Sequence, residues 1–439
     1  MAQGKRLHLS YERMVMLVDG CPAYKDKYSG GAQITSPVDP DIISRIQNIS
    51  YSFNYNAIRN PELGSTEYIK HRTFANSVST SRIPILSQPT VSLNFDYLLY
   101  DGSNESKIGF NVGSEGFLNY SNFPVDEKNK LYSRPEWSGS NFDAVPDKGD
   151  ANFYVLIDDT SNRADVLGDR GGINFDGMDV VGFGNCYLSD YSINIAVGSF
   201  VSCSVNYLCS NLTYDIIGAA EIKAPSVDGQ GERSQVVVNV PENALENDFV
   251  EYPNDIGESL ALRPGDIDVK IINNKPLSNG GFHLIDLNKD DTSIESINFS
   301  LPIERKDING FGSNYINDRK MQFPIMANAE MTIITRNFEG QDSIKRIFDD
   351  DVDCDIEVEM FVRVLLDDQD PAPNPPGGKI TDFFPEGRPV KKRKIKITAK
   401  NAKLNQEDHS HQVGGFSRIN ASFLFEVTPQ GGFIFEVAQ

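Results

Sequence analysis

The chain has 439 residues, long enough for about two or three domains, and its hydrophobic fraction of 39% is typical of packed cores rather than of disorder. It carries 62 acidic against 41 basic residues, a net charge of −21, which argues against a protein that grips nucleic-acid phosphates through Lys and Arg. The five cysteines have no zinc-type spacing, and no apolar run approaches the roughly 18 residues of a membrane helix. We therefore expect free thiols, assembly in a reducing cytoplasm, and no membrane partner.

The first regular pattern follows a mixed amino-terminal stretch. The segment IQNISYSFNY, which begins at Ile46, alternates apolar and polar residues as a half-buried strand does. A similar segment, IESINFSLPI, begins at Ile294. Each is followed by a Gly-Ser pair, a Tyr-Ile pair and an arginine, Arg72 in the first copy and Arg319 in the second. The common order of these blocks predicts a repeat.

Two further blocks extend this repeat. A Pro-Ile pair precedes a strand pattern by the same spacing in both copies, over 84–93 and 324–333. The segment VLIDD at 155–159 returns as VLLDD at 364–368. Aligned on each other, these blocks predict equivalent strands in the two copies.

The longest shared frame is a hairpin pattern. Residues 185–208 (NCYLSDYSINIAVGSFVSCSVNYL) align without a gap with 401–424 (NAKLNQEDHSHQVGGFSRINASFL). Both contain an Asn, a Leu three residues later, a Val-Gly-x-Phe segment and an aromatic-Leu pair. Each copy therefore predicts two alternating strands joined by a glycine-containing turn. The turn residues are Gly198, Phe200, Gly414 and Phe416.

Four blocks in the same order indicate a tandem duplication in a mainly β chain, with two β-sandwich or barrel-forming domains. We expect an amino-terminal segment over 1–45 and a first domain over 46–214. A linker or inserted small β segment is expected over 215–293, and a second domain over 294–439.

Two strand patterns in the second domain place charge on one face. Acidic residues alternate with apolar ones in the first pattern, and they are Asp351, Asp353, Asp355, Glu357 and Glu359. The second pattern carries Lys392, Lys394, Lys396 and Lys400. We expect the lysines to pair with the acidic strand, because opposite charges across strands contribute about 0.2–1 kcal/mol per pair. The acidic face is then either a solvated sheet face or a lumen or inter-subunit surface.

The sequence contains no recognisable catalytic or cofactor motif. His409 and His411 lie beside Glu407 and Asp408, but no third ligand has metal-site spacing, so a surface loop is favoured over a metal site. The chain has no GxSxG motif and no phosphate-binding glycine loop. We expect no enzymatic activity, no metal and no cofactor.

The hairpin pattern at 185–208 resembles that of phage tail-tube (major tail) proteins, in which a Cys-Tyr-Leu strand precedes a Val-Gly-x-Phe hairpin and an alternating strand. The stretch ALRPGDI at 261–267 also resembles a recurring segment of large phage tail proteins. The resemblance implies small β-sandwich domains, each flanked by a helix, whose long hairpins close into a barrel around a DNA channel. Most members form hexameric rings from single domains, so a duplicated chain is expected to form trimeric, pseudo-hexameric rings.

The function implied by this resemblance is that of a structural virion protein, a tail-tube subunit whose stacked rings conduct DNA during ejection. The implied partners are further copies of the chain, for ring closure and ring stacking, other tail proteins, and viral DNA that passes without specific binding. The implied location is the virion tail, assembled in the host cytoplasm. An acidic lumen would repel phosphates, in keeping with the net charge of −21.

Two alternatives remain open from the sequence. A neck or baseplate ring of the same fold differs from a tube in its copy number per particle. A β-sandwich adhesin would bind host glycans through loop aromatics, although such side chains more often serve as local packing anchors. The candidate aromatics are Phe110, Phe117, Tyr120 and Trp137.

Overall fold

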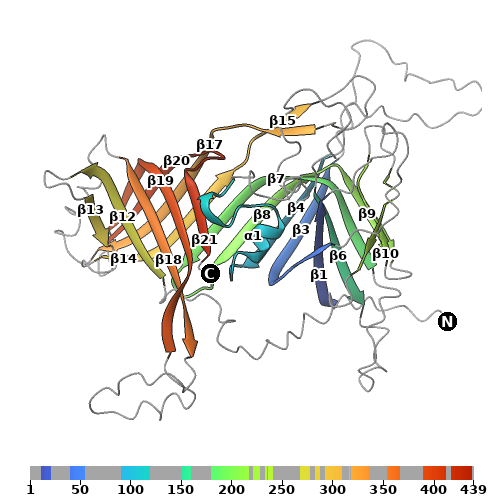
Figure 1. Ribbon diagram of the computed structural model, residues 1–439, viewed down its shortest axis with the longest axis horizontal. Helices are drawn as coiled ribbons and strands as arrows, with labels where there is room; N and C mark the ends of the chain where they lie inside the picture. The colour runs from blue at the N-terminus through green and yellow to red at the C-terminus, as the bar shows by residue number, and fades with distance from the viewer. Residues whose placement is uncertain are drawn as a thin grey trace, which may run out of the picture.

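The computed structural model is mainly β, with one short helix in the part of the chain that it describes (Figure 1). The described residues are 11–20, 40–54, 90–118, 151–159, 179–216, 221–227, 233–234, 236–240, 267–276, 282–286, 292–308, 316, 318–335, 353–365, 389–411 and 417–437. No helix within these ranges is long and apolar enough to cross a membrane. The mainly β class predicted from the alternation is confirmed.

The elements fall into two sets along the chain. The first set is β1 (Tyr11–Gly20), β2 (Asp41–Ile43), β3 (Ile46–Asn54), β4 (Thr90–Leu98), α1 (Ser103–Lys107), β5 (Gly113–Gly116), β6 (Ala151–Asp159), β7 (Asp179–Ala196), β8 (Ser202–Cys209), β9 (Asn211–Ile216), β10 (Glu221–Lys223) and β11 (Val237–Asn239). The second set is β12 (Ile267–Pro276), β13 (Phe282–Asp286), β14 (Thr292–Pro302), β15 (Arg305–Ile308), β16 (Asp318–Met321), β17 (Ile325–Thr335), β18 (Cys354–Leu365), β19 (Pro389–His411), β20 (Ser417–Val427) and β21 (Phe433–Val437).

The strands form two copies of one antiparallel pairing network. In the first copy β7 pairs with β6, β8 and β9, while β6 pairs with β1 and β8 continues through β4 to β3. In the second copy β19 pairs with β18, β20 and β21, while β18 pairs with β12 and β20 continues through β17 to β14. We call these networks the first repeat and the second repeat; Figure 1 shows them on the right and on the left.

Irregular positions recur at matching places in the two hairpins. The register shifts directly after Leu188 in β7 and directly after Leu404 in β19. Three residues earlier, Asn185 and Asn401 both adopt a positive φ, of 52° and 54°. This left-handed conformation is uncommon outside glycine, and Asn tolerates it better than most residues. The gapless alignment of 185–208 with 401–424 therefore holds residue by residue in the two described strands of each hairpin.

Two of the other predicted alignments are wrong in register. The pairing of β4 with β8 and of β17 with β20 makes Val91 equivalent to Ala327, four residues before the expected Met331. The pairing of β6 with β7 and of β18 with β19 makes Val155 equivalent to Val358, six residues before the start of VLLDD. Both register errors are shifts by an even number of residues. An even shift keeps the alternating faces matched, so short apolar blocks align equally well in the wrong register.

Each repeat reaches further toward the amino terminus than the sequence blocks indicated. β1 pairs with β6 as β12 pairs with β18, which makes Met16 equivalent to Val269. The segments expected at 1–45 and 215–293 therefore both supply strands to the repeats. The second of these segments also supplies the β10–β11 pair, a small sheet of its own.

Each repeat has two layers that share one long strand. β7 pairs with β6 and β9 in one layer and with β8 in the other, and β19 does the same in the second repeat. Between the layers, Phe153 of β6 lies 5.6 Å from Phe95 of β4 and 4.5 Å from Tyr207 of β8, measured between ring centroids. All three side chains are buried, and burial of such large aromatic surfaces holds the layers together.

Candidate functional site

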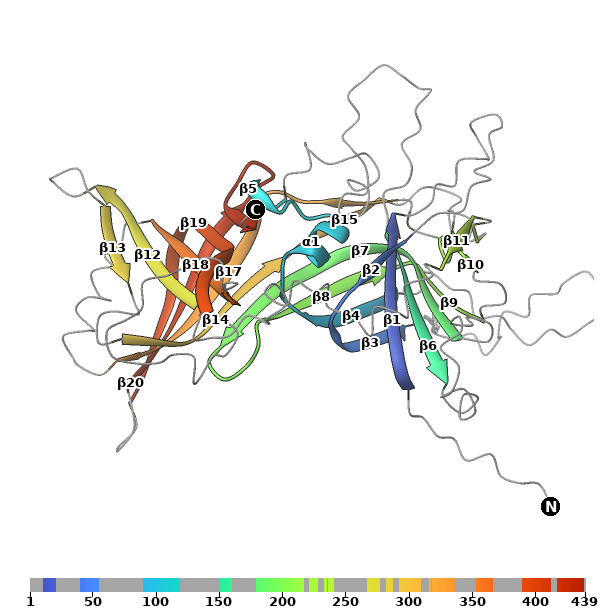
Figure 2. The same cartoon turned by 60° about the horizontal axis from the view of Figure 1, so that its bottom comes forward.

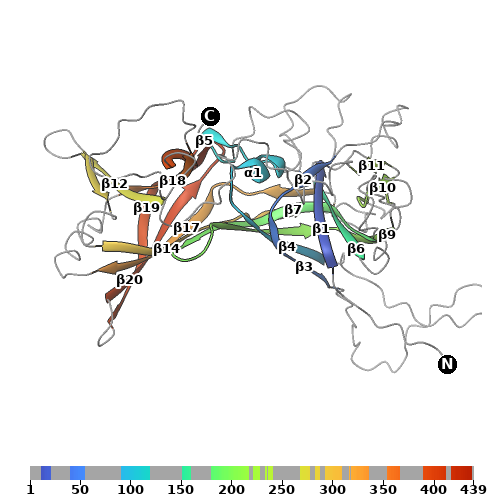
Figure 3. The same cartoon turned by 90° about the horizontal axis from the view of Figure 1, so that it is seen from below.

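The two repeats join into one antiparallel sheet of eight strands, which we call the shared sheet. Its order is β3, β4, β8, β7, β14, β17, β20 and β19. The first repeat supplies the first four strands and the second repeat the last four. In Figure 3 they form a band that runs from one repeat into the other. The end strands of this band are β3 and β19.

One face of the shared sheet is lined by small polar side chains, which alternate along each strand with buried apolar ones. The set is Ser50, Ser52, Ser92, Asn94, Ser192, Asn194, Ser202, Ser204, Asn206, Asn298, Ser300, Asn328, Thr332, Asn420 and Ser422. We call this surface the polar face. Hydrogen bonds cross its strands: the Ser52 and Ser92 hydroxyls lie 2.7 Å apart, and Ser422 Oγ donates to Asn328 Oδ1 at 2.9 Å.

Acidic side chains add negative charge to the polar face. Asp96, Glu330 and Asp408 share its side of the sheet, opposite Ser204, Asn298 and Asn420 respectively. Arg418, on the same side, forms an ion pair with Glu295, with Nε and Oε2 2.9 Å apart. Glu295 neutralises the Arg418 guanidinium, and the hydroxyls, amides and carboxylates named for this face do not offer the cationic groups that hold phosphates.

The pairing of β7 with β14 makes the shared sheet continuous, and we call this contact the junction. Seven residue pairs run from Ser296↔Ala196 to Pro302↔Asp190. Within them, Phe299 faces Ile193 and Leu301 faces Tyr191, and all four side chains are fully buried. Burying side chains of this size contributes roughly 1.5–3 kcal/mol each. The junction joins two different edges of the repeat, so it is a heterologous contact.

Two arginines of the second repeat fasten it to the first. Arg305 Nε donates to the Leu188 carbonyl at 2.7 Å, and Arg319 Nη1 donates to the Leu208 carbonyl at 3.0 Å. Both guanidinium groups also lie over the ring of Tyr187, 5.5 and 5.4 Å from its centroid. The sequence blocks marked Arg319 as a repeated position but did not reveal this contact. Its counterpart Arg72 lies outside the described residues.

The segment from α1 to β5 crosses from the first repeat to the second (Figure 2). β5 pairs with β21, and the Phe117 amide donates to the Phe433 carbonyl at 2.8 Å. The Phe117 ring lies 5.4 Å from the Phe433 ring and 5.6 Å from the Phe435 ring, between centroids. Gly102 has a φ of 77°, and a Cβ there would lie only 3.0 Å from Phe435. The first repeat therefore covers β21 closely.

Phe110 and Phe117 do not form a glycan platform. Both rings are fully buried and stack on each other with centroids 4.0 Å apart. The hypothesis that these two side chains stack on sugars is wrong, because the α1–β5 segment uses them to pack against the core. Tyr120 and Trp137 lie outside the described residues.

Glu105 anchors α1 from inside the core. The Tyr97 hydroxyl donates to its Oε1 at 2.7 Å and the Tyr191 hydroxyl at 3.1 Å, and Cys203 Sγ lies 3.6 Å away. Burial raises the pKa of Glu105, and these hydrogen bonds lower the pKa in part. The three partners lie on β4, β7 and β8, so one carboxyl group ties the helix to three strands. No sequence motif marked this residue.

The end strand β3 carries exposed aromatics where β14 carries junction residues. The shared register makes Tyr51 equivalent to Phe299 and Phe53 equivalent to Leu301. Tyr51 and Phe53 are 44% and 39% exposed, whereas both counterparts are fully buried at the junction. β3 therefore presents the kind of edge that β14 uses to join the repeats.

The other end strand, β19, carries the counterpart of the β7 edge. The gapless alignment makes Glu407 equivalent to Tyr191 and His409 equivalent to Ile193. His409 and His411 lie in this strand and not in the predicted surface loop. His409 Nε2 lies 2.7 Å from Glu407 Oε1. Among the described residues, no group of three or more His, Cys, Asp or Glu side chains is placed to hold a metal ion.

Asp355, Glu357 and Glu359 of the acidic pattern lie in β18, which is outside the shared sheet, and Asp353 directly precedes that strand. The described carboxylates of this pattern are engaged within the chain. Their partners are Lys403 for Asp353, the Asn401 amide for Asp355, Lys396 for Glu357 and Lys270 for Glu359, at 3.4, 2.9, 2.8 and 2.6 Å. Asp351 lies outside the described residues. A lumen or inter-subunit role for these carboxylates stays a prediction.

The lysine pattern forms part of β19, and β19 pairs with β18 as the sequence predicted. Lys392, Lys394, Lys396 and Lys400 all lie in this strand. Lys396 forms the ion pair with Glu357, and the Lys400 amide bonds to the Gly432 carbonyl at 2.8 Å. Lys270 of β12 was not predicted as a partner; its hydrogen bond to Glu359 raises the pKa of Lys270.

These ion pairs occupy positions that are apolar in the first repeat. Lys270, Glu357, Glu359 and Lys396 are equivalent to Leu17, Tyr154, Leu156 and Val180. In the first repeat the four apolar side chains pack under the β10–β11 pair. The charged face of β18 and its neighbours is therefore the ion-paired counterpart of a covered apolar face.

The predicted hairpin turn of the first repeat is present between β7 and β8. Gly198 has a φ of 89°, which favours glycine, and the nearby Phe200 is 52% exposed. Gly414 and Phe416, the turn residues of the second copy, lie outside the described residues.

Comparison with known proteins leaves the family open. No protein-family model matches the chain, and no curated protein matches its sequence. An assignment of function therefore depends on the shared sheet and its two end strands.

Proposed function

We propose that this protein is a structural subunit whose copies join edge to edge into rings, and that stacked rings form a DNA-conducting tube of the phage tail type. The observation that carries the proposal is the junction between β7 and β14. It joins two equivalent repeats through two different edges. A heterologous contact of this kind closes a ring when it is repeated around an axis.

The end strands of the shared sheet offer the same contact to a second copy. Transfer of the junction register pairs β3 of one copy with β19 of the next, with Phe53 opposite Glu407 and Tyr51 opposite His409. This pairing covers the exposed aromatics of β3 and leaves neither β3 nor β19 as an unpaired edge strand of the shared sheet. Three copies of the eight-stranded sheet give a closed sheet of 24 strands, with threefold symmetry and pseudo-sixfold symmetry.

The polar face is the proposed channel wall. The opposite face of the shared sheet is occupied by the second layer of each repeat, so a ring of such sheets turns the polar face inward. Its hydroxyls, amides and carboxylates hold water and repel phosphates, which suits DNA that passes without binding. In this proposal the polar face takes the place that the sequence had suggested for the acidic strand.

A neck or baseplate ring is the second candidate, because it would use the same edges. Only the number of copies per particle separates it from a tube. No observation on the described residues favours a glycan-binding adhesin, since Phe110 and Phe117 are buried.

Electron microscopy of negatively stained, purified protein over a range of concentrations tests the proposal. We expect three-lobed rings or tubes to form from the unmodified protein. Phe53→Glu places a carboxylate opposite Glu407 of the next copy and removes an apolar contact, so the concentration needed for rings should rise at least about tenfold. Adding Glu407→Lys to Phe53→Glu should restore assembly through an opposite-charge pair. A chain that stays monomeric at every concentration contradicts the proposal.

A further inference from the structure

β9 presents two large apolar side chains to solvent. Tyr214 and Ile216 are 66% and 69% exposed, and we call them the β9 patch. They alternate along the strand with Asp215, on the same side as Leu212, which packs against the main core. The β9 patch therefore extends the core surface outward at the flank of the first repeat, where β9 pairs with β7.

The equivalent positions in the second repeat are covered: Phe435 is buried and Val437 is partly buried against the core. β9 pairs with β7 through Tyr214↔Val181, and β21 pairs with β19 through Phe435↔Ile397, which makes Tyr214 equivalent to Phe435. The same registers make Ile216 equivalent to Val437. Phe435 is 0% exposed, because the α1–β5 segment of the first repeat covers it. β9 is the same surface without that cover.

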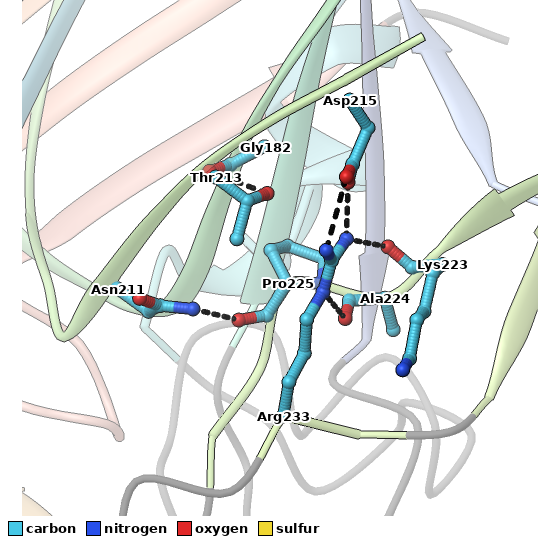
Figure 4. Close-up of polar contacts among 8 residues, drawn as sticks. All are labelled: Gly182, Asn211, Thr213, Asp215, Lys223, Ala224, Pro225 and Arg233. Atoms are coloured by element: carbon cyan, nitrogen blue, oxygen red, sulfur yellow. Dashed lines mark hydrogen bonds and ion pairs between the residues drawn. The ribbon is translucent and has the colours of Figure 1, made fainter. Parts of the chain in front are cut away.

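The opposite side of β9 is held firmly in place (Figure 4). Arg233 forms an ion pair with Asp215 and donates from Nε to the Ala224 carbonyl at 2.9 Å. Asn211 Nδ2 donates to the Pro225 carbonyl at 2.7 Å. These contacts fix the strand against the segment that directly follows β10. The β9 patch is therefore presented on a rigid strand, with little ordering entropy to lose on binding.

We infer that the β9 patch is a docking site for the second repeat of another copy of this chain, placed as the first repeat is placed on β21. This inference rests on the proposed ring, and it adds a contact in the second layer to the β3–β19 pairing within the shared sheet. The two repeats are equivalent, but only the second is covered. The first repeat covers the second at β14 and β21, whereas the equivalent strands of the first repeat, β3 and β9, carry exposed side chains.

Site-specific photo-crosslinking tests the inference directly. p-Benzoylphenylalanine replaces Tyr214 in a mixture of unlabelled and ¹⁵N-labelled chains, which is irradiated after ring assembly. We expect covalent dimers that contain one light and one heavy chain, with the crosslink mapped to the second repeat. The matched control places the same probe at Met326, which is 49% exposed and lies on the polar face side of the shared sheet, and it should give no such dimers.

The outcomes separate this inference from the proposed function. Rings that form without light–heavy crosslinks from position 214 overturn the inference and leave the ring proposal standing. Failure of the unmodified chain to form rings overturns the ring proposal, and the inference with it.

A double substitution supplies a second readout. Tyr214→Ser with Ile216→Ser should raise the concentration needed for assembly at least about tenfold, because two apolar side chains lose their cover. The unfolding transition of the monomer should not move, since both side chains are exposed in the single chain. Met326→Ser should leave assembly unchanged. Equal assembly of the double variant and the unmodified protein would count against the inference.

Discussion

Glu105 places a carboxyl group inside the core of the first repeat, where charge is costly. Burial raises the pKa of this group above its ordinary value of 4.5. Its hydrogen bonds to Tyr97 and Tyr191 give the carboxyl a defined place, and Tyr191 itself lies at the junction. One buried side chain thus connects α1, the core and the contact between the repeats.

The pH dependence of stability should reveal Glu105. A carboxyl whose pKa is raised by folding favours the folded state most below its unfolded pKa, and this contribution is lost as the pH rises through the folded pKa. The free energy of unfolding of the unmodified protein, relative to Glu105→Gln, should therefore fall above about pH 4.5, by up to about 1.4 kcal/mol per pH unit within the window. Urea unfolding of both proteins between pH 4 and pH 8 measures this difference in unfolding free energy.

Asp190→Asn is the comparison variant for that experiment. Burial also raises the pKa of Asp190, so Asp190→Asn should remove a pH dependence of the same sign. Asp190 is present in both the unmodified protein and Glu105→Gln, so its contribution cancels in that comparison. Parallel stability curves for the unmodified protein and Glu105→Gln would contradict the assignment of a buried, perturbed carboxyl.

Single residues of this kind could not be predicted from the sequence. Glu105 lies in a five-residue helix with no motif, and its role depends on Tyr97, Tyr191 and Cys203, which come from other elements. The lysine that pairs with Glu359 was missed for the same reason, because β12 was not recognised as a neighbour of β18.

The antiparallel β15–β16 pair is the element that holds the junction from one side. Its two arginines reach across to carbonyl groups of β7 and β8, and Arg319 is buried with its charge balanced by Asp307 at 3.1 Å. A planar guanidinium group meets these partners and the Tyr187 ring together, a geometry that lysine does not reproduce.

Arg319→Lys should therefore destabilise the protein by roughly 1–3 kcal/mol, because it leaves buried hydrogen-bonding groups without a well-placed donor. The matched control is Arg418→Ala, which removes an arginine whose ion pair with Glu295 is about half exposed, and it should cost less than about 1 kcal/mol. Urea unfolding of the two variants measures both costs. Equal costs would show that Arg319 does not fasten the repeats.

At the scale of elements, the repeated hairpin and the mainly β class were predictable, because alternation and a gapless frame survive in the sequence. The registers of the Pro-Ile and VLIDD blocks were not predictable, because the alternation of side chains along a strand has a period of two residues and looks the same after any even shift. The equivalence of β1 with β12 was missed because their outward faces diverged: Leu17 is covered by β10–β11, whereas its counterpart Lys270 pairs with Glu359.

At the scale of the molecule, the two repeats share a fold but not a surface. The junction inside the chain is apolar, with Tyr191 and Ile193 facing Leu301 and Phe299. The proposed seam between chains sets Glu407 and His409 against Phe53 and Tyr51. A ring of three chains would therefore alternate a permanent apolar contact with a more polar one, which suits a subunit that folds first and assembles later.

Cysteine crosslinking across the proposed seam tests the central claim, that copies join through β3 and β19 in the register of the junction. Tyr51→Cys with His409→Cys, in a Cys21→Ser background, places two thiols opposite each other on neighbouring copies; the four described native cysteines are buried. Mild oxidation of assembled protein should give covalent trimers on denaturing gels. Tyr51→Cys with Asp408→Cys is the control, because Asp408 points to the other face of the sheet and should not crosslink. Covalent trimers from the first pair alone are the predicted result; rings in which neither pair crosslinks, or in which the control pair crosslinks equally, would contradict the account.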